Sequence, residues 1–182
     1  MLFNVAQLLQ DDPGATRHYE IDEPPYRIDD GVEAISPLTG PVKLNRTNRG
    51  VLADADLATD VRLECSRCLE EVVVPIRTHI TEEFYPTVDL RSGLTIDRPE
   101  GGTGFMLNEA HELDLTEPVR QSILLELPMK PLCRADCAGL CPQCGQNLNE
   151  GTCQCEREPT DPRLGQLGEW LKGNRVHSSE QR

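Results

Sequence analysis

The sequence predicts an α+β protein with a small antiparallel β-sheet, one or two packed helices and a cysteine-rich C-terminal extension. Two runs of alternating apolar residues on either side of Cys65 and Cys68 predict the sheet. Apolar residues at helical spacing before and after these runs predict the helices. Beyond residue 131 the apolar periodicity gives way to closely spaced cysteines and glycines. We therefore expect a core domain over 1–130 and a cysteine-rich extension with a terminal helix over 131–182.

The first elements are short. Segment 4–10 has apolar residues at helical spacing, Asn4 as a candidate cap and an Asp-Asp-Pro-Gly stop behind it. Extended chain is expected around 19–28, interrupted by a Pro-Pro pair, and again at 42–44. A polar cluster at 45–50 then predicts a turn.

The clearest element is a hairpin. Apolar residues alternate over 53–65 and again over 72–80, with many β-branched side chains. We expect two antiparallel strands with the C-x2-C turn at or near their junction. The chain over 86–108 is rich in Gly and Pro and predicts a long loop.

Two helices complete the expected elements. The first covers 116–127, with Thr116 as cap, Pro118 in its first turn and Pro128 ending it. The second begins at Asp161, and leucines at helical spacing mark one face of it up to residue 171.

The composition excludes several classes of protein. A net charge of -13 argues against a broadly basic nucleic-acid binder. No apolar run approaches the ~18 residues of a transmembrane helix, so no membrane association is expected. The N-terminus has no basic region followed by a long apolar stretch, so we expect no secretory signal and a cytoplasmic location. Cytosolic cysteines stay reduced and are more often metal ligands than disulfides.

The eight cysteines form four close pairs, and two such pairs can supply the four corners of a tetrahedral zinc site. The candidate ligands are Cys65, Cys68, Cys133, Cys137, Cys141, Cys144, Cys153 and Cys155. About two structural Zn²⁺ ions are expected, which makes the C-terminal extension zinc-bound. Zinc would also support a core that is thin for this length, since structural sites contribute roughly 10–16 kcal/mol of apparent binding free energy. Four disulfides and an iron–sulfur cluster are the alternatives, and the small turns without a ferredoxin-like run favour zinc.

The pairs can combine in three ways. We favour the pair 141/144 with 153/155, because only eight residues separate them and closing that loop costs little entropy. The pair 65/68 would then join 133/137 and tie the hairpin to the chain after the 116–127 helix. The main rival makes one local site from 133, 137, 141 and 144. Gly145, directly after Cys144, suits such a turn because it tolerates positive φ.

No enzyme is expected. Four-cysteine sites leave no open position for water, the histidines do not form a catalytic arrangement, and GGTG lacks the spacing of a phosphate loop. Five arginines near the hairpin are candidate RNA contacts, with a salt-bridged surface as the alternative. They are Arg46, Arg49, Arg62, Arg67 and Arg77.

The chain resembles the YceD family, named for large ribosomal RNA subunit accumulation. The resemblance lies in FNVAQLL, RTNRG, LECSRCLE, DLTEPVRQSILLELPMKPLC, DCAGLCPQCGQNLNEGTCQC and DPRLGQL. It places a C-x-R-C-L motif on residues 65–69 and a cysteine block on 133–155. It implies a cytoplasmic bacterial or plastid protein whose partners are ribosomal RNA or large-subunit assembly proteins.

We therefore expect a non-enzymatic accessory factor in large-subunit ribosomal RNA accumulation or ribosome biogenesis, with no small-molecule substrate. A redox-responsive zinc-thiolate switch is the alternative, because C-x-C and C-x2-C pairs can release zinc on oxidation.

Overall fold

The structure is a computed structural model that describes residues 1–90, 92–155 and 170. The chain forms two compact units, Met1–Gly139 and Leu140–Arg182. The first unit contains every strand and both helices named below. The helix expected from Asp161 onwards lies outside the described residues, apart from Trp170.

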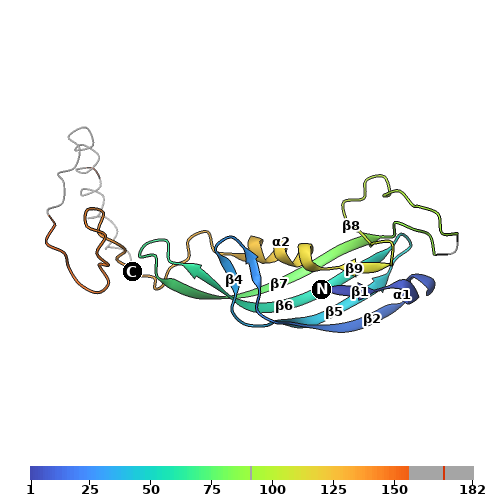
Figure 1. Cartoon of the computed structure of the whole chain (residues 1–182), viewed down its shortest axis with the longest axis horizontal. Helices are drawn as coiled ribbons and strands as arrows, with labels where there is room; N and C mark the ends of the chain where they lie inside the picture. The colour runs from blue at the N-terminus through green and yellow to red at the C-terminus, as the bar shows by residue number, and fades with distance from the viewer. Residues whose placement is uncertain (91, 156–169, 171–182) are drawn as a thin grey trace, which may run out of the picture. The chain divides into compact units, whose positions relative to one another are not determined.

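Two long strands form the centre of the first unit. β6 (Val51–Glu64) pairs antiparallel with β7 (Glu71–Tyr85) over its whole length, and Figure 1 shows them side by side. The register runs from Val51 opposite Phe84 to Glu64 opposite Glu71, so Cys65 and Cys68 fall in the connection. This pairing confirms the predicted hairpin.

The other edge of β6 is shared by two strands. β5 (Leu38–Arg46) pairs with its first half, and β2 (Thr16–Glu23) continues the sheet beyond β5. β4 (Val32–Ala34) pairs with the second half of β6, and β3 (Arg27–Asp29) lies beyond it. β8 (Phe105–Met106) adds a short parallel pairing to the end of β7, inside the region expected to be loop.

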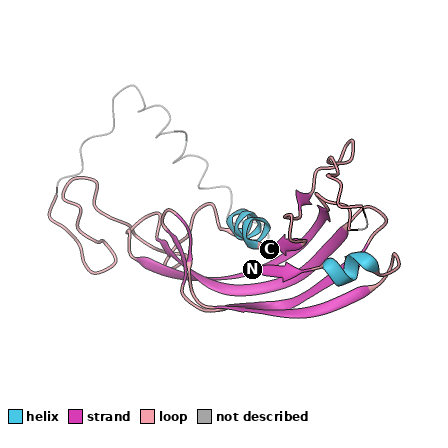
Figure 2. Ribbon diagram, turned by 45° about the vertical axis from the view of Figure 1, so that its right-hand side comes forward, coloured by secondary structure: helices cyan, strands magenta, loops and turns pink. Residues whose placement is uncertain are grey.

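The core lies on one face of this sheet. Odd-numbered residues of β6 are buried from Val51 to Leu63, and even-numbered ones point the other way, as the period of two requires. Figure 2 shows α2 (Thr116–Glu126) against the concave face. Its Val119 and Ile123 are fully buried in the same cluster as Leu8 of α1 (Ala6–Gln10).

The N-terminus differs from the expectation. Leu2–Asn4 form strand β1, which pairs with β9 (Glu112–Asp114), and α1 begins only at Ala6. Val5 rather than Asn4 is the N-cap residue of α1, although Asn4 Oδ1 accepts a hydrogen bond from the Ala6 backbone N–H at 3.1 Å. The helical spacing thus predicts α1, but it does not predict β1. The strand that pairs with β1 lies more than a hundred residues away.

Helix α2 was predicted at nearly the right bounds, with the wrong cap. Leu115 is the N-cap residue, and Thr116 is the first helical residue. The Thr116 hydroxyl oxygen accepts a hydrogen bond from the amino group of Met1 at 3.1 Å. It is therefore engaged by the chain terminus, a contact that local sequence patterns do not report.

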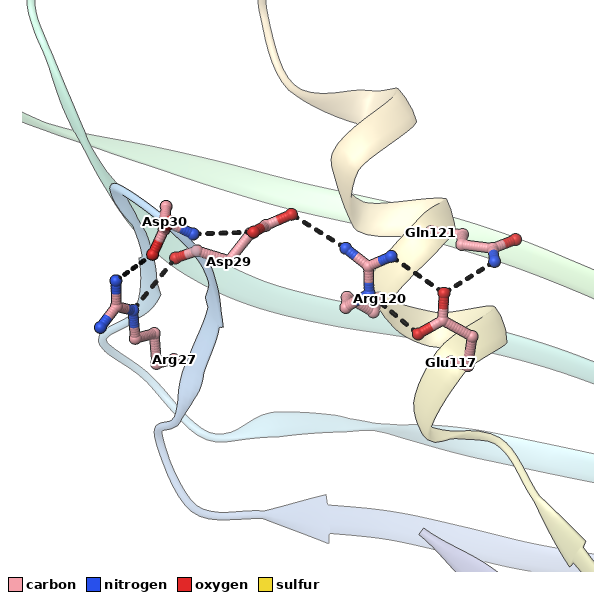
Figure 3. A network of polar contacts seen from close by, with 6 residues as sticks. All are labelled: Arg27, Asp29, Asp30, Glu117, Arg120 and Gln121. Atoms are coloured by element: carbon pink, nitrogen blue, oxygen red, sulfur yellow. Dashed lines mark hydrogen bonds and ion pairs between the residues drawn. The ribbon is translucent and has the colours of Figure 1, made fainter.

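Helix α2 is also tied to β3. Arg120 Nη1 donates to Asp29 Oδ2 at 2.9 Å, and its Nε and Nη2 reach the two carboxylate oxygens of Glu117 at the same distance (Figure 3). Gln121 Nε2 donates to Glu117 as well. The side chains of this network are partly exposed.

The RTNRG motif forms the tight turn between β5 and β6. Thr47 Oγ1 accepts from the backbone N–H groups of Arg49 and Gly50, and it contacts Glu83 Oε1 at 3.1 Å. A Cβ at Gly50 would lie 2.0 Å from the Phe84 carbonyl oxygen, so only glycine allows β6 to begin this close to β7.

No helix among the described residues is long and apolar enough to cross a membrane.

Candidate metal centres

Four cysteines meet in the first unit. The sulfurs of Cys65, Cys68, Cys133 and Cys137 all lie within 4.8 Å of one another. The Sγ–Sγ distance is 3.8 Å from Cys65 to Cys137 and 3.5 Å from Cys68 to Cys133. A tetrahedron with zinc–sulfur bonds of about 2.3 Å has corners about 3.8 Å apart. The spacing therefore fits one tetrahedral ion, whereas an iron–sulfur cluster would place inorganic sulfide between its ligands.

A tight turn at the end of the hairpin presents the first two sulfurs. The Leu69 N–H donates to the Cys65 carbonyl at 3.0 Å, and the Cys65 N–H donates to the Glu70 carbonyl at 2.8 Å. Leu69 closes this turn with a φ of 62°, in the left-handed region. Cys65 and Cys68 are buried, so the turn holds both sulfurs away from water.

The second unit repeats the same turn. Cys141, Cys144, Cys153 and Cys155 also bring their sulfurs within 4.8 Å of one another. The Gly145 N–H donates to the Cys141 carbonyl at 2.9 Å, and the Cys141 N–H donates to the Gln146 carbonyl at 2.8 Å. Gly145 has a φ of 73°, which confirms the positive φ expected there. Leu69 holds the equivalent place in the first turn.

The segment after α2 delivers the other half of the first cluster. The Ser66 N–H donates to the Pro131 carbonyl at 2.9 Å, which docks this segment on the hairpin. Arg67 Nη1 then donates to the carbonyl of Cys137 at 2.7 Å. A Cβ at Gly139 would lie 3.1 Å from the Arg67 carbonyl oxygen, so the chain passes close to the turn here. Cys137 is buried and Cys133 is exposed.

The protein environment ionises one thiol of each cluster most easily. Backbone N–H groups of Cys68 and Arg67 point at Cys65 and lower its pKa to about 6, against the opposing effect of burial. Backbone N–H groups of Cys144 and Gln143 lower the pKa of Cys141 to about 6 in the same way.

Other thiols in the clusters resist ionisation. The Glu70 N–H favours the Cys68 thiolate, but burial and three neighbouring sulfurs outweigh it and raise the pKa to about 12. The hydrogen bond with Cys144, followed by burial, raises the pKa of Cys155 to about 12. Desolvation of its sulfur among the neighbouring thiols is the main cause of a raised pKa at Cys133, although the residue as a whole is exposed. A divalent cation offsets this repulsion, since it holds its thiol ligands deprotonated.

The two clusters are the grouping that sequence spacing favoured. The rival local grouping is not the one found among the described residues, because Cys133 and Cys137 group with the first pair and Cys141 and Cys144 group with the last pair. The boundary between the units falls after Gly139. Cys133 and Cys137 thus lie with the hairpin, although the sequence placed them in the extension beyond residue 130.

The five candidate arginines do not come together. Arg46 and Arg49 flank the turn before β6, Arg77 lies opposite Ala58 near the middle, and Arg62 and Arg67 lie at the far end. The 14 residues of β6 span about 46 Å at about 3.3 Å per residue. These five arginines therefore do not form a single basic patch around the hairpin.

Three of these arginines have structural partners. Arg46 Nη1 donates to the carbonyls of Thr47 and Gly50. Arg62 lies 3.8 Å from carboxylates of both Glu33 and Glu71. Arg67 binds the Cys137 carbonyl. Of these three, Arg62 pairs with carboxylates as the salt-bridged alternative expects, whereas Arg46 and Arg67 bind backbone carbonyls.

Sequence reasoning missed a third group of potential ligands. Asp54, Asp56 and His79 bring ligand atoms within 4.8 Å of one another on the exposed side of the sheet. His79 Nδ1 lies 2.9 Å from Asp56 Oδ1. The antiparallel register places these two residues directly opposite, a relation that becomes visible only once the strands are aligned.

Comparison with known proteins agrees with these features. A family model described as large ribosomal RNA subunit accumulation protein YceD matches residues 53–170, which include both cysteine clusters. The chain belongs to the YceD family. An uncharacterised protein of Mycobacterium tuberculosis is 36% identical over 131 residues, which are 71% of this chain and 60% of that protein.

More distant members of the family extend the comparison. A chloroplastic YCED homolog of Arabidopsis thaliana, named a large ribosomal RNA subunit accumulation protein, is 27% identical over 73% of this chain and 48% of its own length. An uncharacterised protein of Bacillus subtilis is 26% identical over 80% of this chain and 81% of its own length. The matched part of this chain spans 60% of the length of the mycobacterial relative. No solved structure matches.

Proposed function

We propose that this YceD-family chain is a non-enzymatic accessory factor in large-subunit ribosomal RNA accumulation or ribosome biogenesis, stabilised by two structural zinc ions. The family match and the name of the Arabidopsis relative support the ribosomal role. The observation that carries the zinc assignment is the meeting of Cys65 and Cys68 with Cys133 and Cys137 at tetrahedral spacing.

Zinc in this first cluster is a cross-link. It joins the hairpin to the chain beyond α2 across about 70 residues, where the backbone hydrogen bond from the Ser66 N–H to the Pro131 carbonyl already begins the contact. Four thiolates leave no open position, so the ion stabilises structure and activates no water. Free thiols in such sites require a reducing compartment, and we place the protein in the cytoplasm on that ground.

A redox-responsive switch is the second candidate. It is favoured by the exposure of Cys133 in one cluster and Cys144 in the other. An oxidant reaching either sulfur would convert cysteine pairs to disulfides and release zinc. Brief treatment with hydrogen peroxide, followed by zinc release and thiol counting, tests it. A site that keeps its zinc while the fold persists contradicts the switch.

The ribosomal role is tested in cells that lack the gene. We expect the ratio of mature large-subunit to small-subunit ribosomal RNA to fall, and wild-type protein to restore it. A Cys65→Ser/Cys68→Ser variant should restore it poorly, because the first cluster holds the fold together. An unchanged ratio in the deletion strain contradicts the proposed role.

A further inference from the structure

The face of the sheet turned away from α2 is rich in carboxylates. On β6 this outer face carries every even-numbered residue, because the odd-numbered ones are buried. The register extends the face across β2, β5, β4 and β7. Its carboxylates are Glu20, Asp22, Glu33, Asp54, Asp56, Asp60, Glu64, Glu71 and Glu83. Its permanent cations are Lys43, Arg62 and Arg77, and the register adds Arg27 of β3 opposite Glu33.

Most of this negative charge is not compensated within the described part of the chain. Arg62 is shared between Glu33 and Glu71, and His79 contacts Asp56. The other carboxylates of the outer face form no ion pair with any described residue. Folding therefore gathers like charge on one surface, an arrangement that costs stability unless a cation-bearing partner covers it.

A hollow interrupts the middle of the outer face. Along β6, the pairing with β5 extends to Ala58 and the pairing with β4 starts at Val61. The two strands therefore leave a gap between them. The cavity there measures about 410 Å³. Its lining includes Ala58 and Thr59 of β6 and the charged residues Asp22, Asp60 and Arg77. Its size admits a long side chain, and carboxylates outnumber cations in its lining.

We propose that the outer face docks an extended lysine- and arginine-rich protein segment. Alternate side chains of an extended segment repeat about every 6.8 Å, the same spacing as the outward positions along β6, which hold carboxylates at 54, 56, 60 and 64. One basic side chain would enter the hollow between Asp22 and Asp60. RNA is disfavoured as the occupant, because its phosphates would meet like charge.

This inference rests on the proposed function for its setting, since ribosome assembly supplies partners with basic segments. It replaces direct RNA contact by the arginines with contact through protein. The outer face would bind basic segments with modest sequence specificity. Charge complementarity and the fit of one side chain in the hollow would govern this binding.

The test compares two variants of equal net charge. Asp22→Lys/Asp60→Lys, the lining variant, reverses the two carboxylates that line the hollow, and Glu109→Lys/Glu126→Lys reverses two exposed carboxylates elsewhere. The probe is a fluorescent 15-residue peptide of alternating Lys or Arg and Ser, titrated at 150 mM salt. We expect the lining variant to raise Kd at least tenfold and the control variant to raise it less than threefold. Circular dichroism checks that both variants fold.

Four outcomes overturn the inference. Equal weakening by both variants means that only net charge attracts the peptide. Tighter binding of a 15-nucleotide single-stranded RNA than of the peptide assigns the surface to RNA. Self-association that the lining variant abolishes assigns it to a second copy. If the peptide does not bind while gene deletion still lowers large-subunit ribosomal RNA, only the docking surface is refuted. If the peptide binds while gene deletion leaves ribosomal RNA unchanged, only the proposed function is refuted.

Discussion

Arg67 reaches from the first cysteine turn to the opposite half of its cluster, where its Nη1 donates to the carbonyl of Cys137 at 2.7 Å. The two residues are 70 positions apart, and Arg67 lies between the two cysteines of the first turn. The arginine within C-x-R-C therefore positions the cluster. A lysine could not reproduce this role with its compact ammonium group, because the planar guanidinium fixes the direction of its donors.

Arg67→Ala should loosen the segment that carries Cys133 and Cys137. The lost charge-assisted bond should lower the free energy of unfolding by about 1–2 kcal/mol in urea denaturation. Zinc should also leave faster in the presence of a chelator. Arg77→Ala is the control, because this exposed residue lies on mid-strand, and its effect should stay below about 0.5 kcal/mol. Equal effects of the two substitutions would contradict a positioning role for Arg67.

The two clusters should have unequal weight in the fold. Cys65→Ser breaks the cross-link between the hairpin and the chain after α2, so hydrogen exchange should accelerate over β6 and β7. Cys153→Ser breaks a cluster within the second unit, so acceleration should begin only near Cys141. Comparable exchange of β6 and β7 in both variants would show that the second cluster also supports the sheet.

The purified protein should contain about two zinc ions per chain when prepared under reducing conditions. Elemental analysis provides the measurement. The exposed group of Asp54, Asp56 and His79 is a possible source of extra metal, so His79→Ala serves as the control and should leave the content unchanged. A metal-free protein with the same fold would exclude structural zinc.

The left-handed backbone conformation of Leu69 in the first turn is unfavourable. A left-handed residue with a Cβ costs roughly 1–2 kcal/mol, which glycine avoids at the equivalent Gly145. Because the Leu69 side chain is mostly exposed, little packing offsets this cost. Leu69→Gly should therefore leave stability unchanged or raise it by up to about 1 kcal/mol, while β-branched Leu69→Val should lower it. Thermal unfolding of the zinc-loaded proteins measures both, and a large loss with glycine would reveal packing by Leu69.

The sequence predicts the elements that depend on residues close together in the chain. Alternation with β-branched residues identified β6 and β7, and the short loop between Cys144 and Cys153 favoured the observed grouping. The pairing of β1 with β9 and the contact of Met1 with Thr116 depend on chain segments far apart, which no local spacing encodes. The dispersal of the arginines follows from the length of β6.

The carboxylate of Glu117 should make helix α2 sensitive to acid. Hydrogen bonds from Arg120 and then Gln121 lower its pKa from 4.5 to about 2 (Figure 3). A depressed pKa means that the folded protein favours the carboxylate. The stabilisation is therefore fully present above about pH 4.5 and is lost as the pH falls through about 2.

Glu117→Gln should accordingly lower Tm at pH 7, and the difference from wild type should shrink steadily between pH 4.5 and 2. Using a difference cancels the acid sensitivity of the cysteine clusters, which both proteins share. Arg120→Gln should lower Tm further at pH 7, because Arg120 also binds Asp29 on β3 and removing it frees α2 from the sheet edge. Glu109→Gln is the matched control, since Glu109 forms no ion pair with a described residue. A pH-independent difference between Glu117→Gln and wild type would show that the carboxylate's charge is not what holds this network.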